Sequence, residues 1–194
     1  MTTAFCMLWS NPQTIAAFLG SRRIGQSSSE LCPTVRSGYT ALRRSLSICP
    51  ATVRMTREFI TSSAEETIEL GRELAALLAP PKLVLLRGDL GAGKTTLVKG
   101  IAEAFHAAPA ENVTSPTFTL IHEYRGPAAT LYHIDLYRVD TQRELETLGL
   151  DDLMSENSVL LIEWGEKFPR FERERDVEIA LDRTGEDRRR IVVS

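Results

Sequence analysis

The segment from Gly88 to Thr95, GDLGAGKT, most constrains what this chain can fold into, because it fits the P-loop pattern G-x-x-x-x-G-K-[ST] in full. The segment before it, KLVLLR at 82–87, holds a continuous apolar run that predicts a buried strand. After it, apolar residues recur at helical spacing at Leu97, Val98, Ile101 and Phe105. A strand, a glycine-rich loop and a helix in this order predict an α/β fold with an anion-binding loop.

Each residue type in this loop has a chemical reason to be there. The glycines let the backbone turn so that successive N–H groups point at one anion, and the following helix presents its positive end to the same anion. Lys94 is expected to reach the outer phosphates of a nucleotide, and the Thr95 hydroxyl is expected to bind Mg²⁺. The pattern predicts ATP and Mg²⁺ as cofactors, with the nucleotide held by Asp89, Leu90, Gly91, Ala92, Gly93, Lys94, Thr95 and Thr96.

Two later strands end in acidic residues that are candidates for the metal site. A P-loop needs a carboxylate at the end of a neighbouring strand, either to bind the metal directly or to hold its water shell. Four apolar residues lead to Glu163, and a second predicted strand leads to Asp135. We favour Glu163 as the metal ligand, because its apolar run places it at the rim of the central sheet, and we assign Asp135 to water positioning or to the metal's surroundings.

The remaining patterns complete an α/β sandwich. A capping-box signal at 62–66 predicts a helix over 67–78 with an apolar stripe that includes Leu77, and two prolines then end it. Strand-like segments flank turns and predict two hairpins, within 117–137 and 176–194. We therefore expect a P-loop NTPase-like sandwich with a central mixed sheet, parallel in its core near the P-loop, with antiparallel hairpins outside.

Several classes of protein lack support in this sequence. A GTPase would need a guanine-reading Asn-Lys-x-Asp, which is absent, and no run of about 18 apolar residues predicts a membrane span. The net charge of −3 argues against non-specific binding of nucleic acid. Roughly 140 residues after Met55 leave little room for a second substrate, so we expect ATP hydrolysis in the service of a partner protein. A kinase of a small metabolite and a nucleotide-sensing interaction module are the alternatives.

Five segments taken together resemble a known family. GDLGAGKTT, SPTFTLIHEY, YHIDLYR, ELETLGLDD and LIEWGEK occur in the order and spacing of the TsaE (YjeE) family of P-loop ATPases, over residues 61–193. The P-loop by itself is generic, whereas SPTF, HIDLYR and LIEW are far more specific. The resemblance implies a Mg²⁺-dependent ATPase that is required for the threonylcarbamoyladenosine modification of tRNA.

The same resemblance implies a role for individual residues. Gly91, Gly93, Lys94 and Thr95 would hold the phosphates and Mg²⁺, and Glu163 would bind Mg²⁺ as well. Thr117, in a switch-like loop over 115–117, would close on the outer phosphate. Asp135 would assist hydrolysis, which makes Lys94, Thr117 and Asp135 the expected catalytic residues.

The resemblance also implies the partners. They would be the TsaD and TsaB proteins, whose complex transfers the threonylcarbamoyl group, and ATP hydrolysis would reset that complex between turnovers. Contact with tRNA would be indirect, through the complex, and no membrane is involved. Trp164 would lie at the edge of the site and contact the loop or a partner, although a role in capping the core is an equal rival.

A change in composition divides the chain near residue 54. Residues 1–54 contain six arginines, one acidic residue and all three cysteines, whereas residues 55–194 carry a net charge of −8 and have no cysteine. We expect the first segment to be a disordered extension, either an organelle transit peptide or sequence upstream of a true start at Met55, and we favour the second. Residues 55–194 are then the P-loop ATPase domain, in the cytoplasm, or in a mitochondrion or plastid if the extension is a transit peptide.

Four further expectations about individual side chains can be tested by the structure. His133 precedes Asp135 on its strand, and we expect it to pack or to hydrogen-bond rather than to catalyse. The run 188–190 of three arginines is expected at a solvated strand start, in preference to tRNA phosphates. Arg138 is a surface residue or a charge-stabilising arginine. Lys94 is expected to be reachable by solvent, so that its replacement would change stability little.

Overall fold

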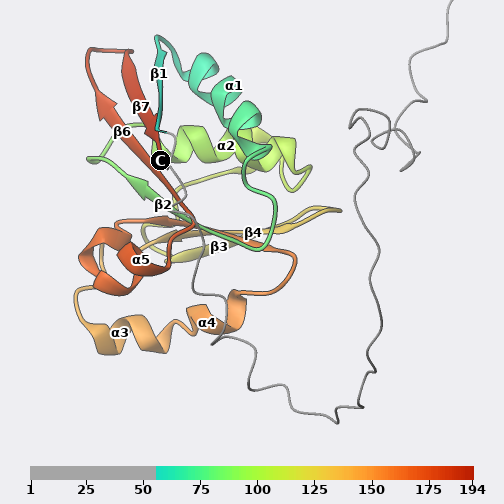
Figure 1. Ribbon diagram of the computed structural model, residues 1–194, viewed down its shortest axis with the longest axis vertical. Helices are drawn as coiled ribbons and strands as arrows, with labels where there is room; N and C mark the ends of the chain where they lie inside the picture. The colour runs from blue at the N-terminus through green and yellow to red at the C-terminus, as the bar shows by residue number, and fades with distance from the viewer. Residues whose placement is uncertain (1–55) are drawn as a thin grey trace, which may run out of the picture. The chain divides into compact units, whose positions relative to one another are not determined.

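The computed structural model describes residues 56–194, so the predictions for residues 1–54 and for Met55 lie outside the described part. A seven-stranded sheet runs through this part in the order β1-β7-β6-β2-β5-β4-β3 (Figure 1). The strands are β1 Arg57–Thr61, β2 Lys82–Arg87, β3 Ile121–Arg125, β4 Thr130–Asp135, β5 Ser158–Glu163, β6 Val177–Arg183 and β7 Arg189–Val193.

The sheet is mixed, and its parallel part surrounds the strand that leads into the P-loop. Strand β2 pairs in parallel with β5 on one side and with β6 on the other, and β4 pairs in parallel with β5. The outer pairs, β3 with β4, β6 with β7 and β1 with β7, are antiparallel. The predicted α/β sandwich with a parallel core and antiparallel hairpins is confirmed.

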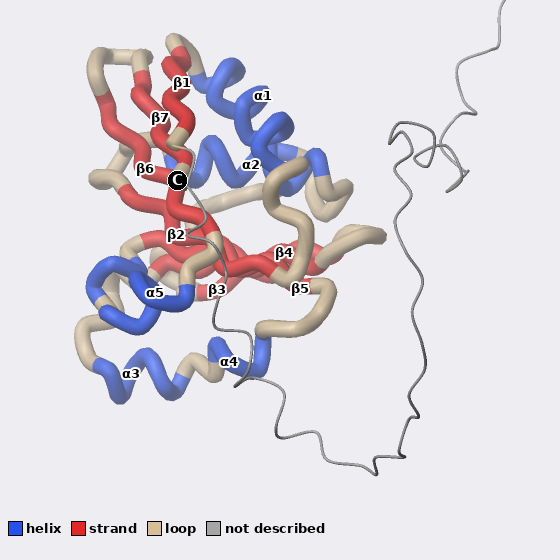
Figure 2. The backbone as a smooth tube through the Cα atoms, in the orientation of Figure 1, coloured by secondary structure: helices blue, strands red, loops and turns tan. Residues whose placement is uncertain are grey.

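Helices cover both faces of the sheet, as the tube in Figure 2 shows. Helices α1 (Ala64–Ala75) and α2 (Lys94–Ala104) pack on one face, and α3 (Gln142–Thr147), α4 (Leu150–Leu153) and α5 (Pro169–Glu174) lie on the other. Strand β2 needs both layers, because its side chains alternate between them: Val84 and Leu86 join the first core, and Leu83 and Leu85 the second. None of the helices between residues 56 and 194 has the length and apolar character of a membrane span.

The first helix begins and ends earlier than predicted. Ser63 is its N-cap, with the side-chain oxygen accepting a hydrogen bond from the Glu66 N–H, so α1 starts at Ala64. The helix ends at Ala75, and Leu77 is therefore exposed instead of lying on the apolar stripe.

Other boundaries differ where local patterns were ambiguous. Strand β3 starts only at Ile121, so the predicted strand residues from 117 to 120 form a loop. By contrast, the pattern of 142–153 indicates a helix with a break at Gly149, and the structure confirms it: α3 and α4 lie on either side of this glycine, whose φ of 61° is in the left-handed region. Strand β1 and helix α5 were not predicted, because five and six residues are too short for a periodic signal.

Candidate nucleotide-binding site

The P-loop connects the end of β2 to the first turn of α2. Gly93 is the N-cap of α2 with φ of 107°, a value that favours glycine, and Lys94 is the first helical residue. Gly88, with φ of 141°, packs so closely on β6 that an added Cβ would lie 2.4 Å from the Leu181 carbonyl oxygen. The loop thus requires glycine at both ends of the pattern, once for the turn and once for the close approach of β6.

The Lys94 side chain folds back over the loop that precedes it. Its Nζ donates hydrogen bonds to the carbonyl oxygens of Gly88, at 2.6 Å, and Asp89, at 3.1 Å. Nζ also lies 3.7 Å from Glu163 Oε2 and 4.8 Å from the centre of the Trp164 ring. The expectation that solvent reaches Lys94 is wrong, because these groups surround the ammonium and leave the residue 4% exposed.

The two candidate carboxylates stand side by side at the same edge of the sheet. Asp135, the last residue of β4, is the register partner of Glu163, the last residue of β5. Glu163 is in turn the register partner of Leu86 on the strand that enters the P-loop. The parallel strands therefore bring both acids next to the loop, and both are buried, at 2% and 4% exposure.

Glu163 is held by a histidine and a threonine. Its Oε1 lies 2.8 Å from Nε2 of His133, which is fully buried, and Thr95 Oγ1 donates to the same oxygen at 3.3 Å. Because an ionised carboxylate only accepts hydrogen bonds, His133 Nε2 is the donor in this contact. His133 Nδ1 is buried without a hydrogen-bond partner in the described residues. His133 therefore hydrogen-bonds, as predicted, and the partner is the candidate metal ligand.

Asp135 is held by the loop that precedes β3. Thr117 Oγ1 donates to Asp135 Oδ2 at 2.6 Å, and the backbone N–H of Tyr137 donates to Oδ1 at 2.9 Å. The Ser115 and Thr117 hydroxyls are 2.8 Å apart. The loop over 115–117 is thereby connected to the same carboxylate that ends β4.

These groups line one cleft. Of the eight predicted loop residues, six line it, whereas the Ala92 side chain lies in the core and the Asp89 carbonyl binds Lys94. Three lining residues had not been given a definite place in the site: Tyr137, Trp164 and Arg189. The full lining consists of Leu90, Gly91, Gly93, Lys94, Thr95, Thr96, Ser115, Thr117, Asp135, Tyr137, Glu163, Trp164 and Arg189.

A comparison with family models decides the identity of this fold and site. The model described as "Threonylcarbamoyl adenosine biosynthesis protein TsaE" matches residues 61–191, which include the P-loop and both carboxylates. The chain belongs to the TsaE family. The family resemblance predicted from the five sequence segments is therefore confirmed.

Curated relatives and a solved structure agree with the family model. The tRNA threonylcarbamoyladenosine biosynthesis protein TsaE of Bacillus subtilis is 40% identical over 131 residues, which are 68% of this chain and 80% of that protein. The protein of the same name from Aquifex aeolicus is 36% identical over 139 residues, 72% of this chain and 96% of its own. The crystal structure of Bacillus subtilis YdiB has 34% identity and a TM-score of 0.55, over 72% of this chain and 84% of that one. This TsaE-family chain thus has a role in the biosynthesis of threonylcarbamoyladenosine in tRNA.

The donor set of this TsaE-family site fits a nucleotide with Mg²⁺. Thr95 Oγ1 and the Glu163 carboxylate are both hard oxygen donors, which Mg²⁺ prefers. The described residues contain no group of three His, Cys, Asp or Glu side chains arranged to hold a metal. A Mg²⁺ ion here would therefore draw its other ligands from phosphate and water, as is usual for this ion. The first residues of α2, Lys94, Thr95 and Thr96, line the same cleft, and the free N–H groups of a first helical turn suit a phosphate.

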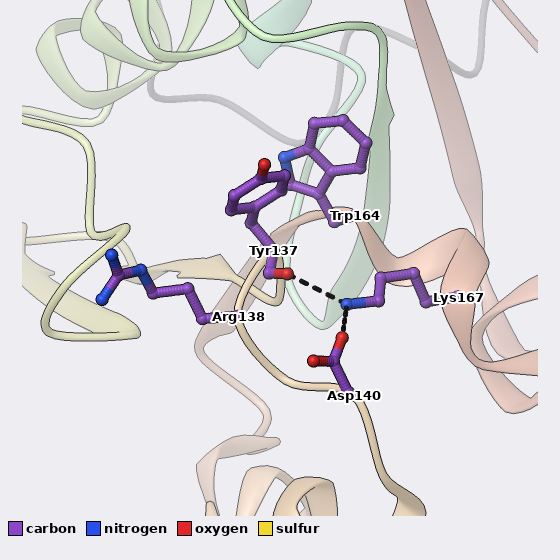
Figure 3. Close-up of a pocket in the computed structure, with 5 residues that line it drawn as sticks. All are labelled: Tyr137, Arg138, Asp140, Trp164 and Lys167. Carbon is purple, nitrogen blue, oxygen red and sulfur yellow. Dashed lines mark hydrogen bonds and ion pairs between the residues drawn. The ribbon is translucent and has the colours of Figure 1, made fainter.

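A second hollow adjoins the cleft and shares two of its aromatic residues (Figure 3). The Tyr137 and Trp164 rings are 5.1 Å apart, and Lys167 Nζ donates to the Tyr137 carbonyl and to Asp140. Trp164 has φ of 61°, a costly value for a large side chain, so its neighbours hold it against strain. The ring packs on the second core and also lines the cleft. The predicted core-capping position and the predicted position at the edge of the site are therefore compatible.

Arg138 points away from the other four side chains of this hollow (Figure 3). Its guanidinium carbon lies 4.4 Å from the centre of the Phe118 ring, in the loop that also carries Thr117. Arg138 is absent from the lining of the nucleotide cleft. The structure therefore favours the interpretation of Arg138 as a surface residue that stacks on the loop.

Proposed function

We propose that this chain is a Mg²⁺-dependent ATPase that acts on the TsaD–TsaB complex during threonylcarbamoyladenosine synthesis. One observation supports it above the others: the buried Lys94 and Glu163 and the half-buried Thr95 converge at the mouth of the P-loop. A cation, a hydroxyl and a carboxylate in this arrangement suit a phosphate chain with its metal. Asp135 stands beside them in register and completes the site.

Each side chain has a separate task in this proposal. Lys94 exchanges the carbonyl oxygens of Gly88 and Asp89 for phosphate oxygens. Thr95 and Glu163 hold the metal, and bound Mg²⁺ supplies neutralisation of the charge on the phosphates. Asp135 has one oxygen fixed by Thr117 and the other by the Tyr137 N–H, so its carboxylate is oriented before substrate arrives. An oriented carboxylate accepts a hydrogen bond from the attacking water and positions it on the terminal phosphorus.

The surroundings of the cleft support a protein partner. Leu90 in the P-loop is 78% exposed, and Phe118 in the loop next to Thr117 is 80% exposed. Large apolar side chains that are this exposed at the tips of two site loops suit burial against another protein. Such a partner would sense the conformation of both loops, which would couple ATP hydrolysis to a change in the complex.

The decisive experiment measures phosphate release from ATP by the full chain, with and without the TsaD–TsaB pair, and with and without Mg²⁺. Release that needs Mg²⁺ and is stimulated by the pair supports the proposal. ATP-dependent labelling of a small metabolite would favour a kinase, and tight ATP binding without release in any mixture would favour a nucleotide sensor. The Lys94→Ala protein, purified in parallel, controls for contaminating ATPase.

A further inference from the structure

The hairpin of β6 and β7 brings one arginine to the nucleotide cleft. Side chains alternate along β7, so Arg189 lies on the same face as Ile191 and Val193, which belong to the core beneath α1 and α2. The N-terminus of α2 lies on this face, and Arg189 extends the apolar row towards it. Arg190 points to the opposite face, where it pairs with Glu58 and Asp182.

Arg189 passes directly over the glycine that caps α2. A Cβ added to Gly93 would lie 3.7 Å from Arg189 Nε and 3.9 Å from its Cγ. These distances are ordinary van der Waals contacts, so Arg189 packs directly against Gly93, whose φ of 107° is what requires glycine. Arg189 thus lies against the N-cap of α2 and lines the same cleft as the first residues of that helix.

The guanidinium of Arg189 carries no ion pair with any carboxylate among residues 56–194. Within this described part of the chain, its hydrogen bond runs from Nη1 to the Glu186 carbonyl oxygen, at 3.1 Å, and most of its five N–H donors have no partner there. Other half-buried arginines of the chain, such as Arg87 and Arg175, are paired with glutamates. A half-buried, uncompensated cation beside a P-loop suits an anionic ligand.

The position of Arg189 in the sheet decides which part of that ligand it meets. Strands β5 and β4, which carry Glu163 and Asp135, lie on one side of β2, whereas β6 and β7 lie on the other. The phosphate that is hydrolysed belongs near the two acids. On the basis of the proposed function, we infer that Arg189 binds the nucleotide at its nucleoside end, through the phosphate next to the ribose. Arg189 is then a binding residue for ATP and ADP alike.

The test compares Arg189→Ala with the wild-type chain by calorimetric titration with ATP analogue and with ADP, both with Mg²⁺. We expect both affinities to fall about tenfold and to fall equally, because both ligands carry the phosphate next to the ribose. Arg189→Lys keeps the charge and the aliphatic stem but loses the planar fork, so it should recover part of the loss. Arg188→Ala, which removes the exposed neighbouring arginine, should bind as wild type does. Melting temperatures verify that each variant is folded.

Each outcome bears on the inference separately from the proposed function. Equal binding by wild type and Arg189→Ala would overturn the inference while leaving the ATPase proposal intact. A loss confined to ATP would place Arg189 at the terminal phosphate and would overturn the assigned position. A wild-type chain that binds neither nucleotide would overturn the proposed function and this inference with it. If Arg189→Ala fails to fold, Arg189→Lys supplies the same comparison.

Discussion

The two sides of strand β2 present side chains of opposite charge to the nucleotide cleft, in different surroundings. On the carboxylate side, formed by β5 and β4, Glu163 and Asp135 are buried and register partners. On the arginine side, formed by β6, β7 and β1, the charged residues are half-buried or exposed, and Arg190 forms surface ion pairs. Two buried acids next to each other cost stability unless something compensates them, whereas an exposed ion pair costs little and contributes little.

This difference indicates which side of the sheet suits a metal ion and which side suits a phosphate. Every buried acid of the carboxylate side is held by a specific donor: His133 and Thr95 for Glu163, Thr117 and the Tyr137 N–H for Asp135. These donors orient the carboxylates but leave their negative charge, which suits a metal ion and a water molecule. The arginine side offers positive charge that suits a phosphate. The following predictions test this division, beginning with the largest effect.

Replacing Lys94 should have the largest effect, because Lys94 joins the P-loop to the carboxylate side. Lys94→Ala should reduce ATP hydrolysis about 100- to 1,000-fold, the range for loss of a preorganised charge-stabilising donor. Since the ammonium is buried and donates to two carbonyls, the variant should also lose about 1–3 kcal/mol of stability. Phosphate release and denaturant unfolding measure the two effects. Lys99→Ala, on the same helix but outside the cleft, is the control, and near-normal turnover by Lys94→Ala would refute the P-loop assignment.

Replacing Glu163 and Asp135 by their amides, one at a time, should distinguish their roles. Glu163→Gln keeps the shape but loses the charge that a hard divalent cation prefers, so nucleotide binding should lose its Mg²⁺ dependence and hydrolysis should fall with it. Asp135→Asn should keep Mg²⁺-dependent binding but lose turnover, because its role is felt mainly in the transition state.

Calorimetric titration of both variants with an ATP analogue, with and without Mg²⁺, makes this comparison. Loss of the Mg²⁺ dependence in Asp135→Asn but not in Glu163→Gln would show that the roles are exchanged. Wild-type binding and turnover in both variants would remove both acids from the site.

Removing the histidine behind Glu163 should have an intermediate effect. His133→Leu deletes the 2.8 Å hydrogen bond to Glu163 Oε1 and leaves the carboxylate free to turn. Residues that orient a metal ligand typically contribute about 10- to 100-fold to metal affinity, so the Mg²⁺ concentration for half-maximal hydrolysis should rise by that factor. His133→Gln retains a donor and should restore part of the affinity. An unchanged Mg²⁺ requirement in a folded His133→Leu protein would limit the histidine to packing.

The smallest effect is expected on the arginine side, from a surface pair and its pH dependence. Arg190 donates hydrogen bonds to Glu58, which lowers the pKa of that carboxyl below its ordinary value. The pair therefore stabilises the fold above the unfolded pKa, and this contribution is lost as the pH falls through the folded pKa. Thermal unfolding of wild type and Glu58→Gln between about pH 7 and about pH 3 should give curves that converge at the acidic end. Parallel curves would show that the pair contributes nothing.

Much of the fold and of the site was predictable from local signals. The P-loop pattern, the apolar run of β2 and the spacing of α2 are contiguous, so the sequence alone identified them. The proximity of Glu163 and Asp135 was predictable because each ends a strand, and parallel strands bring such ends to one edge. These conclusions depend on residues within about a dozen positions of each other and on the geometry of a parallel sheet.

The tertiary structure alone decided which distant side chains touch the loop. The burial of Lys94 requires Glu163 and Trp164, about seventy residues away, so no local pattern reveals it. His133 shows no more than strand alternation in the sequence, and only the pairing of β4 with β5 turns its Nε2 to Glu163. Arg189 is one of three consecutive arginines, and the sequence by itself does not show which of the three lies at the nucleotide cleft. The pairing of β7 with β6, and of β6 with β2, places one of the three over Gly93 and leaves its neighbours in solvent or ion pairs.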